Sequence, residues 1–398
     1  MQLLWIATKS PWPPRDGGRL LLLETLGALT GVNARIVLVA PCAERGAARL
    51  EIDARLRELA RPVLMPARRR SRVTSLLRSL AGGDPFGLAR HRSGAVRAAV
   101  ERELEGGAFD AVVVEQLQAW PQAGPARRRG LPVVLRAQNV ESDLWCALAA
   151  SRSGIAATVA AREARRLARA EGEAVAAAAW TVTLTASDAT RLVALAGGRG
   201  RVACLPPPFA SCREASGSAL TGEPALVLFS SAGWEPNAEG ERWFVDSVWP
   251  AILRARPAAR LHLFGSAAGA PRRAPAPIVA HPRPASSASA FAPGSILIVP
   301  LRTAIGLRMR ILEAWARGMP VISTPEGAAG LGAEDGRELL LASDASEFVR
   351  AVARLAEERD LAPRLVAAGS ERLAREHSPE RFAHAFRDGL AAALEAGR

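Results

Sequence analysis

Short apolar runs alternate with longer amphipathic segments through the first half of the chain. The apolar runs predict buried strands at residues 3–7, 34–40, 61–65, 111–115, 132–136, 181–185 and 202–205. Helical spacing of apolar positions predicts helices between them at 19–31, 44–60, 86–105, 143–178 and 187–196. Strands that alternate with helices indicate a parallel, doubly wound sheet.

The pattern breaks at Pro206–Pro208 and then restarts. Consecutive prolines end regular structure, and the polar stretch 211–223 after them predicts a linker. Further apolar runs predict strands at 225–230, 260–264, 296–300, 320–323 and 339–341, and helices at 237–256, 307–318, 345–359, 361–376 and 379–396.

The predicted fold class is therefore α/β, with two tandem Rossmann-like domains and a ligand cleft between them. The domains are expected at 1–208 and 209–378. We expect the last segment, 379–398, to be a helix that packs back on the first domain.

Length and composition agree with two domains. The chain has 398 residues, 49% of them hydrophobic, and no apolar run has the roughly 18 residues that a membrane span needs. Residues 1–7 have no basic flank and no cleavage signal after them, so they are interpreted as a first strand rather than a signal peptide. The four cysteines are scattered. They predict neither a metal clip nor a disulfide framework, and a reduced, cytoplasmic setting is expected.

The excess of positive charge lies in the first half. Residues 1–210 hold 30 Lys+Arg and 18 Asp+Glu, a net +12, whereas residues 211–398 hold 22 and 21, a net +1. Such an excess attracts anionic surfaces or substrates. The stretches 68–72 and 90–92 concentrate this charge, but stacking aromatics do not alternate with the basic clusters, so a nucleic-acid partner is not expected. The alternative is a basic surface set by genomic base composition.

Three stretches at predicted strand ends carry residue types that suit ligand binding. Gly17 and Gly18 precede the first helix, where paired glycines let the backbone approach an anion. Gln138 and Asn139 follow the fifth apolar run, at the edge where doubly wound sheets bind ligands. The alternatives are an ordinary turn for the first stretch and a helix cap for the second.

The third stretch begins at Gly306, which is predicted to open a helix. Arg308 and Arg310 would lie in its first turn, where cations oppose the helix dipole unless an anion is bound there. Glu313 follows one turn later and could accept hydrogen bonds from vicinal hydroxyls. The alternative is a solvated helix face with routine charges.

At this point four stretches, in order, resemble the retaining, nucleotide-sugar-dependent glycosyltransferases with the GT-B fold, classified as group 1 or family 4. They are 13–18, 136–142, 234–237 and 300–314, and the last continues into a typical segment at 315–324. The resemblance covers nearly the whole chain, and its most specific part is 300–330.

The resemblance implies a role for each candidate residue. Gly17, Gly18, Asn139, Gly306 and Leu307 would contact the donor, and Glu313 its ribose. The residues that would act in catalysis are Gln138, Arg308 and Arg310. The two arginines would pair with the phosphates and offset the charge on the leaving diphosphate. No metal or other cofactor is expected. The first domain would take the acceptor and the second the nucleotide sugar.

The chain departs from the family pattern at three positions. Gln138 stands where many members have histidine, Ile305 where many have a second glutamate, and Arg310 where lysine is usual. One alternative is therefore a GT-B protein that binds nucleotide or nucleotide sugar without transfer. An epimerase or a phosphorylase on the same fold is another, although the second half lacks the lysine that a pyridoxal-type phosphorylase needs.

The leading prediction is a hexosyltransferase. Its acceptor would be a carbohydrate, a lipid-linked intermediate or a natural product. The basic first half predicts a peripheral contact with a membrane.

Overall fold

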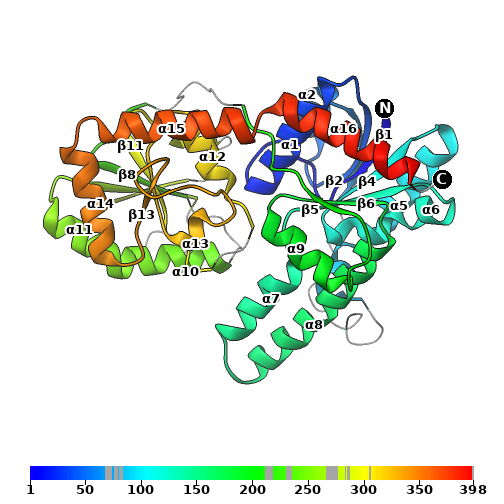
Figure 1. Ribbon diagram of the computed structural model, residues 1–398, viewed down its shortest axis with the longest axis horizontal. Helices are drawn as coiled ribbons and strands as arrows, with labels where there is room; N and C mark the ends of the chain where they lie inside the picture. Colours follow the sequence, from blue (N-terminus) through cyan, green and yellow to red (C-terminus); the bar gives the residue numbers. More distant parts are fainter. Residues whose placement is uncertain are drawn as a thin grey trace. The chain divides into compact units, whose positions relative to one another are not determined.

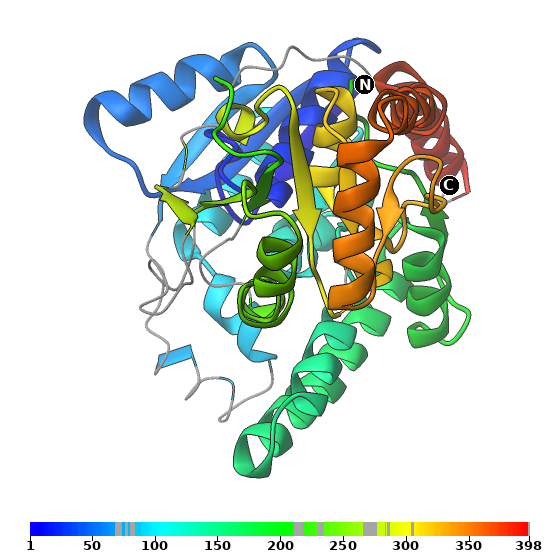
Figure 2. The same ribbon diagram turned by 90° about the vertical axis from the view of Figure 1, so that its left-hand side faces the viewer.

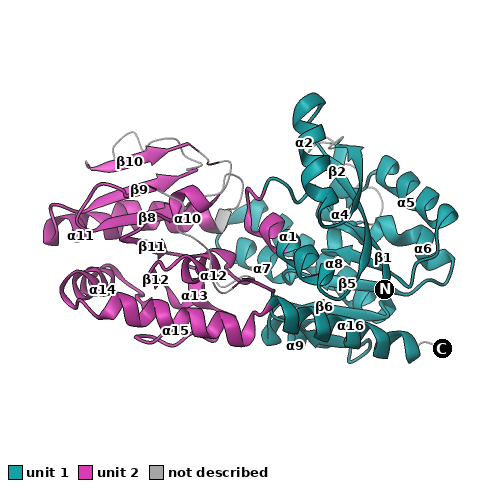
Figure 3. Ribbon diagram, turned by 90° about the horizontal axis from the view of Figure 1, so that it is seen from above, with its two compact units in different colours: residues 1–13, 22–207, 379–398 teal, residues 14–21, 208–378 magenta. Residues whose placement is uncertain are grey.

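A computed structural model describes residues 1–67, 74–75, 79, 84–210, 218–229, 235–265, 277–282, 284, 287–303 and 306–396. The basic stretch 68–72, Trp234 and Ile305, all singled out above, lie outside the described residues. The chain forms two compact units (Figure 3). Unit 1 comprises Met1–Pro13, Leu22–Pro207 and Pro379–Arg398, and unit 2 comprises Pro14–Leu21 and Pro208–Ser378.

Unit 1 is built on a seven-stranded parallel sheet in the order β3-β2-β1-β4-β5-β6-β7. The described strands are β1 (Gln2–Ile6), β2 (Arg35–Cys42), β3 (Arg61–Pro66), β4 (Ala111–Glu115), β5 (Val133–Ala137), β6 (Trp180–Thr183) and β7 (Val202–Cys204). The central strands β4 and β5 are buried at every residue, as an apolar run covered on both faces should be. The strand order reverses between β1 and β4, which marks the ligand position of a doubly wound sheet.

Helices of unit 1 cover the two faces of this sheet. The described helices are α1 (Gly17–Thr30), whose first residues belong to unit 2, and α2 (Gly46–Arg57), α4 (Phe86–His91), α5 (Gly94–Gly106), α6 (Gly124–Arg128), α7 (Glu141–Ala150), α8 (Gly154–Ala177), α9 (Ala186–Leu195) and α16 (Pro379–Glu395), with a 3₁₀ turn at Leu117–Ala123. The last helix packs in the core of unit 1, where Phe386 contacts the rings of Trp5 and Trp180 with centroids 6.2 and 5.4 Å apart.

Unit 2 is built on a six-stranded parallel sheet in the order β10-β9-β8-β11-β12-β13. Its strands are β8 (Ala225–Phe229), β9 (Arg260–Phe264), β10 (Ile278–His281), β11 (Ser295–Val299), β12 (Val321–Ser323) and β13 (Leu340–Leu341). Its described helices are α10 (Glu235–Trp243), a π turn at Phe244–Val248, α11 (Trp249–Ala255), a 3₁₀ turn at Ser287–Ala290, α12 (Met309–Ala316), α13 (Pro325–Ala328), α14 (Ala345–Glu357) and α15 (Leu361–Glu376). Figure 1 shows α14 and α15 beside this sheet. The strand order reverses between β8 and β11.

The alternating parallel α/β fold is confirmed, but two long predicted helices are each broken in the structure. The predicted helix 86–105 divides into α4 and α5 because Ser93 caps a new helix, its hydroxyl accepting from the backbone N–H of Val96. The predicted helix 143–178 divides into α7 and α8 at Gly154, which has a φ of 60°. The two helices run side by side as a hairpin (Figures 1 and 2).

Candidate functional site

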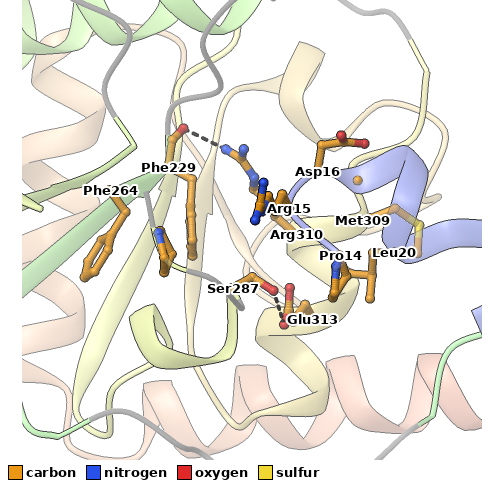
Figure 4. A pocket seen from close by; sticks show the side chains of 12 residues that line it. Pro14, Arg15, Asp16, Leu20, Phe229, Phe264, Ser287, Met309, Arg310 and Glu313 are labelled. Carbon is orange, nitrogen blue, oxygen red and sulfur yellow. Dashed lines mark hydrogen bonds between the residues drawn. The ribbon is translucent and has the colours of Figure 1, made fainter. Parts of the chain in front are cut away.

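A pocket lies in unit 2 at the carboxyl edge of its sheet. It holds about 470 Å³ of space open to solvent, and its walls come from the start of α1, the ends of β8 and β9, and the first turns of α12 (Figure 4). The residues that line it are Pro14, Arg15, Asp16, Gly17, Leu20, Phe229, Phe264, Pro284, Ser287, Met309, Arg310 and Glu313. The pocket therefore lies at the strand ends where this class of sheet binds its ligands.

Two arginines stand at the start of α12. Arg308 is the N-cap residue, in an extended conformation, and one of its terminal nitrogens donates to the carbonyl of Gly306 at 3.0 Å. Its Nε is buried and has no hydrogen-bond partner within the described structure. Burial lowers the pKa of Arg308 to about 10, so the guanidinium still carries its charge at neutral pH. A desolvated cation at the positive end of a helix is unfavourable unless an anion offsets it.

Arg310 is tied to the end of β8. Its guanidinium donates to the carbonyl of Phe229 at 2.7 Å and lies over the Phe229 ring, 4.9 Å from the centroid (Figure 4). A residue in the first turn of α12 is thereby held beside the point where the strand order reverses. Its planar fork can keep this bond and still present other N–H groups to a ligand.

Glu313 is buried one turn further along α12. Its Oε1 accepts hydrogen bonds from the hydroxyl of Ser287 at 2.8 Å and from Nε of Arg317 at 3.2 Å. Its other oxygen, Oε2, is buried and has no partner within the described residues. A buried carboxylate oxygen without a donor costs free energy, so this side of the pocket is suited to a ligand hydroxyl.

The glycine pair begins α1. Asp16 caps that helix, because its carboxylate accepts from the backbone N–H of Arg19 at 3.0 Å. A Cβ at Gly17 would lie 3.7 Å from Met309, within ordinary contact distance. Gly17 thus brings bare backbone against α12, and Gly18 follows it in the same first turn.

A separate polar cluster occupies the carboxyl edge of the sheet in unit 1. Gln138, which follows β5, is buried and donates to Glu115 Oε1 at 2.6 Å while its own Oε1 accepts from Gln116 at 2.8 Å. Glu115 also accepts from Nε1 of Trp5 at 3.0 Å and from Arg136 at 2.5 Å. Three donors on one carboxylate fix the side chains around it.

Asn139 lies beside this cluster and hydrogen-bonds to Glu141, the first residue of α7. Burial raises the pKa of Glu141. The backbone N–H groups of Glu141 and Ser142 donate to the carboxylate of Glu171 on α8, at 2.5 and 3.2 Å. A carboxylate from a neighbouring helix therefore caps α7, whereas the sequence alternative was a cap from the stretch itself.

The structure brings three of the predicted site residues into one pocket: Gly17, Arg310 and Glu313. One expectation was wrong in its geometry, because Gly306 does not open the helix. Gly306 has a φ of 65° and lies three residues before Met309, where α12 begins. Leu307 lies between it and the N-cap Arg308. The left-handed backbone at Gly306 turns the loop so that the helix starts later.

Sequence reasoning missed several residues of both clusters. Phe229, Phe264 and Ser287 reach the pocket from three separate segments. The polar pair Glu115 and Gln116, at the end of an apolar strand, was a visible signal. The position of Ser287, by contrast, depends on the path of a loop.

The described residues offer neither a metal-binding cluster nor a membrane-spanning helix. No three His, Cys, Asp or Glu side chains gather there in a way that could hold a metal ion. Among the helices described, none is long and apolar enough to cross a membrane.

Comparisons with known proteins agree with this geometry. Residues 223–358 match the family model of glycosyl transferases group 1. No curated protein sequence matches the chain. Among solved structures, the chain is similar to HepE from Anabaena in complex with UDP-glucose, at 14% identity, covering 98% of this chain and 100% of that one, with a TM-score of 0.64.

Two further structures share the fold over their whole length. Sucrose-phosphate synthase from Thermosynechococcus elongatus has 12% identity, 100% coverage of both chains and a TM-score of 0.68. The UDP-forming α,α-trehalose-phosphate synthase from Burkholderia vietnamiensis has 14% identity, covers 98% of this chain and 100% of that one, and has a TM-score of 0.60.

Residues 223–358 are similar to glycosyl transferases group 1, and the chain has the GT-B fold of two Rossmann-like domains. The family match includes the stretches 234–237 and 300–314, whereas the stretches 13–18 and 136–142 lie outside it.

Proposed function

We propose that the chain is a glycosyltransferase, which moves a hexose from a nucleotide-sugar donor to an acceptor hydroxyl, with retention at the anomeric carbon and without a metal ion. The observation that carries the proposal is the pairing of the desolvated Arg308 guanidinium with the partnerless Oε2 of Glu313 on one helix. A bound anion would offset the charge of Arg308, and a ligand hydroxyl would donate a hydrogen bond to Oε2 of Glu313. A nucleoside diphosphate supplies both groups.

In this proposal the diphosphate lies at the start of α12. Arg308 and Arg310 would pair with its oxygens, assisted by the backbone N–H groups at Gly17 and Gly18. The ribose would donate a hydroxyl hydrogen bond to Glu313. HepE, whose fold this chain shares, was crystallised with UDP-glucose, and this supports a donor of the same chemical class here.

The proposed reaction needs no enzymic nucleophile. The bond between the anomeric carbon and the leaving phosphate oxygen breaks, and the acceptor oxygen bonds to that carbon on the same face. The acceptor proton passes to the leaving phosphate oxygen, and a nucleoside diphosphate is released. The two arginines offset the negative charge that develops on the diphosphate, which is the role that a divalent cation would otherwise fill.

The donor assignment is tested by replacing both arginines with alanine. The Arg308→Ala, Arg310→Ala variant is expected to raise the dissociation constant of the nucleotide at least tenfold, about 1.4 kcal/mol, because two phosphate partners are lost. Titration calorimetry measures this. The matched control is Arg302→Ala, since Arg302 is an exposed arginine nearby in unit 2 that stacks on Trp243 at 5.5 Å. Unchanged nucleotide affinity in the double variant would show that the donor binds elsewhere.

Metal independence is tested by turnover in EDTA. We expect the rate to stay within twofold of the untreated enzyme, because the arginines and helix termini already provide the positive charge. A full loss of turnover that Mg²⁺ or Mn²⁺ restores would contradict this part of the proposal.

The acceptor domain is proposed to contact an anionic membrane surface or a lipid-linked acceptor. Its support is the net charge of +12 in residues 1–210 against +1 in the remainder. Arg92 in the basic stretch 90–92 forms an ion pair with Asp84 at 2.5 Å, so that stretch is partly neutralised.

A further inference from the structure

Gln116 has a backbone conformation that only glycine adopts readily. It follows β4 directly, with φ 68° and ψ 152°. Side chains with a Cβ are strained in this region, and such strain persists only where the surrounding structure enforces it. The strand that it follows, β4, pairs with β1, and the strand order of unit 1 reverses between these two strands. Strain at the ligand-binding edge of a sheet points to a functional constraint.

The strained backbone lets the side chain of Gln116 bridge two neighbouring strand ends. Its Oε1 accepts from the hydroxyl of Thr8, which follows β1, at 3.0 Å. Its Nε2 donates to Gln138, which follows β5, at 2.8 Å. The backbone N–H of Gln116 still completes the ladder by donating to the carbonyl of Arg136 at 2.9 Å. The residue therefore ends the strand in register and then turns its side chain across the sheet edge.

The hydrogen bonds form a chain with one direction. Glu115 is a carboxylate and can only accept, so Gln138 must present its NH₂ group to it. The carbonyl oxygen of Gln138 then faces Gln116, which must present its own NH₂ group there and its oxygen to the Thr8 hydroxyl. Glu115 thus orients the amide of Gln138, and Gln138 orients the amide of Gln116. Gln138 keeps one N–H and one lone pair for a ligand.

We propose that Gln116 is a positioning residue, whose strained backbone holds the Gln138 amide in the single orientation in which it meets the transferred sugar. This inference rests on the proposed function, because it concerns the step in which Gln138 contacts the sugar. Without the bridge, the Gln138 amide would keep its bond to Glu115 but could swing about it. A small displacement of a contact group lowers the rate of the chemical step more than it weakens donor binding.

Two substitutions separate this role from a structural one. Gln116→Gly relieves the backbone strain and removes the bridge, whereas Gln116→Met keeps the strain and removes the bridge. We expect both variants to lower kcat at least about tenfold while the KM for the donor stays within twofold. Their melting temperatures should move differently: equal to or above wild type for glycine, and below it for methionine. If Gln116 were purely structural, kcat would fall only in the variant whose melting temperature also falls.

The matched control is Asn33→Gly. Asn33 has a φ of 54° in the turn between α1 and β2, so this change relieves a left-handed backbone elsewhere in unit 1. It should leave kcat unchanged. A Gln116→Gly enzyme with kcat within twofold of wild type would overturn the inference, as would a Gln116→Gly enzyme whose melting temperature falls as far as that of Gln116→Met. Absence of turnover by the wild-type enzyme with every nucleotide sugar tried would instead remove the proposed function, and this role with it.

Discussion

Gln138 lies where the resemblance places histidine in many relatives, and its surroundings suit either side chain. Glu115 Oε1 lies 2.6 Å from the Gln138 amide nitrogen and would accept equally well from an imidazole N–H. The Glu115 carboxylate would also keep its hydrogen bonds from Trp5 and Arg136. A histidine there could also become cationic beside the developing charge, which glutamine cannot.

We therefore expect Gln138→His to keep the wild-type kcat or to raise it by up to about tenfold. The measurement is steady-state turnover with slow donor hydrolysis as a second readout, and Gln138→Ala, expected to lose most activity, is the comparison. If the histidine variant binds donor normally yet turns over none, glutamine is a specific adaptation of this enzyme.

Single residues differ in how far the sequence reveals them. The arginines at 308 and 310 stand out because a helix N-terminus repels cations, and this conflict is visible without a structure. Ser287, which holds Glu313, gives no such signal, because the loop that carries it is brought to α12 only by tertiary packing. The strain at Gln116 is equally hidden, since nothing in a sequence reports a positive φ at a non-glycine residue.

At the scale of elements, the spacing of hydrophobic residues predicts where helices occur better than it predicts where they begin and end. The helices α7 and α8 share one amphipathic pattern in sequence, and only the turn at Gly154 divides them. Their packing depends on Glu171, which is buried on α8 and accepts from the first two backbone N–H groups of α7. A cap that comes from a residue 30 positions away in the chain cannot be found from local spacing.

Glu171 predicts how the stability of unit 1 depends on pH. Burial raises its pKa from 4.5 to about 7, so the folded protein binds this proton more tightly than the unfolded chain does. The stabilisation is complete below pH 4.5 and is lost as the pH rises through 7, by on the order of 3 kcal/mol. Glu171→Gln should flatten this dependence, measured as the free energy of unfolding in urea at several pH values.

The control is Glu173→Gln on the same helix. Glu173 is exposed and pairs with Arg169 at 2.9 Å, so its removal should leave the pH dependence as in wild type. A Glu171→Gln protein whose stability still falls between pH 4.5 and 7 as steeply as wild type would contradict the assignment of this proton to Glu171.

At the scale of the whole molecule, the apolar runs predict both sheets because buried parallel strands are nearly continuous hydrophobic segments. The exception is β10, which was not predicted. It is an edge strand whose residues, Ile278 to His281, are exposed or only half-buried, so it lacks the apolar run that identifies the others. The two units have the same alternation of strands and helices, yet residues 1–210 carry eleven more net positive charges than residues 211–398, and fold alone does not explain that difference.

The turn between α7 and α8 gives the proposed membrane contact a definite place in unit 1. Ile155 is 85% exposed and Val159 is 51% exposed, one helical turn apart on the same side of α8. No acidic residue occurs between positions 144 and 161, and Arg152 and Arg162 flank the pair. Both arginines are exposed, and neither forms an ion pair within the described structure. An exposed apolar tip flanked by exposed arginines is the pattern of an interfacial segment that meets anionic lipid.

We expect the full chain to sediment with vesicles that contain anionic lipid at low salt, and much less at high salt, since each arginine near such a surface contributes about 1 kcal/mol. Replacing Ile155 and Val159 with Asp should reduce the bound fraction at least about tenfold, because two charges then oppose both the lipid and its apolar layer. Leu50→Asp is the matched control: Leu50 on α2 is 72% exposed, so this variant also loses an exposed apolar side chain, but away from the tip. Wild-type binding by the tip variant would place the contact elsewhere on unit 1. If the wild-type chain does not bind the vesicles at low salt, the proposed membrane contact is wrong. The basic charge would then reflect genomic base composition.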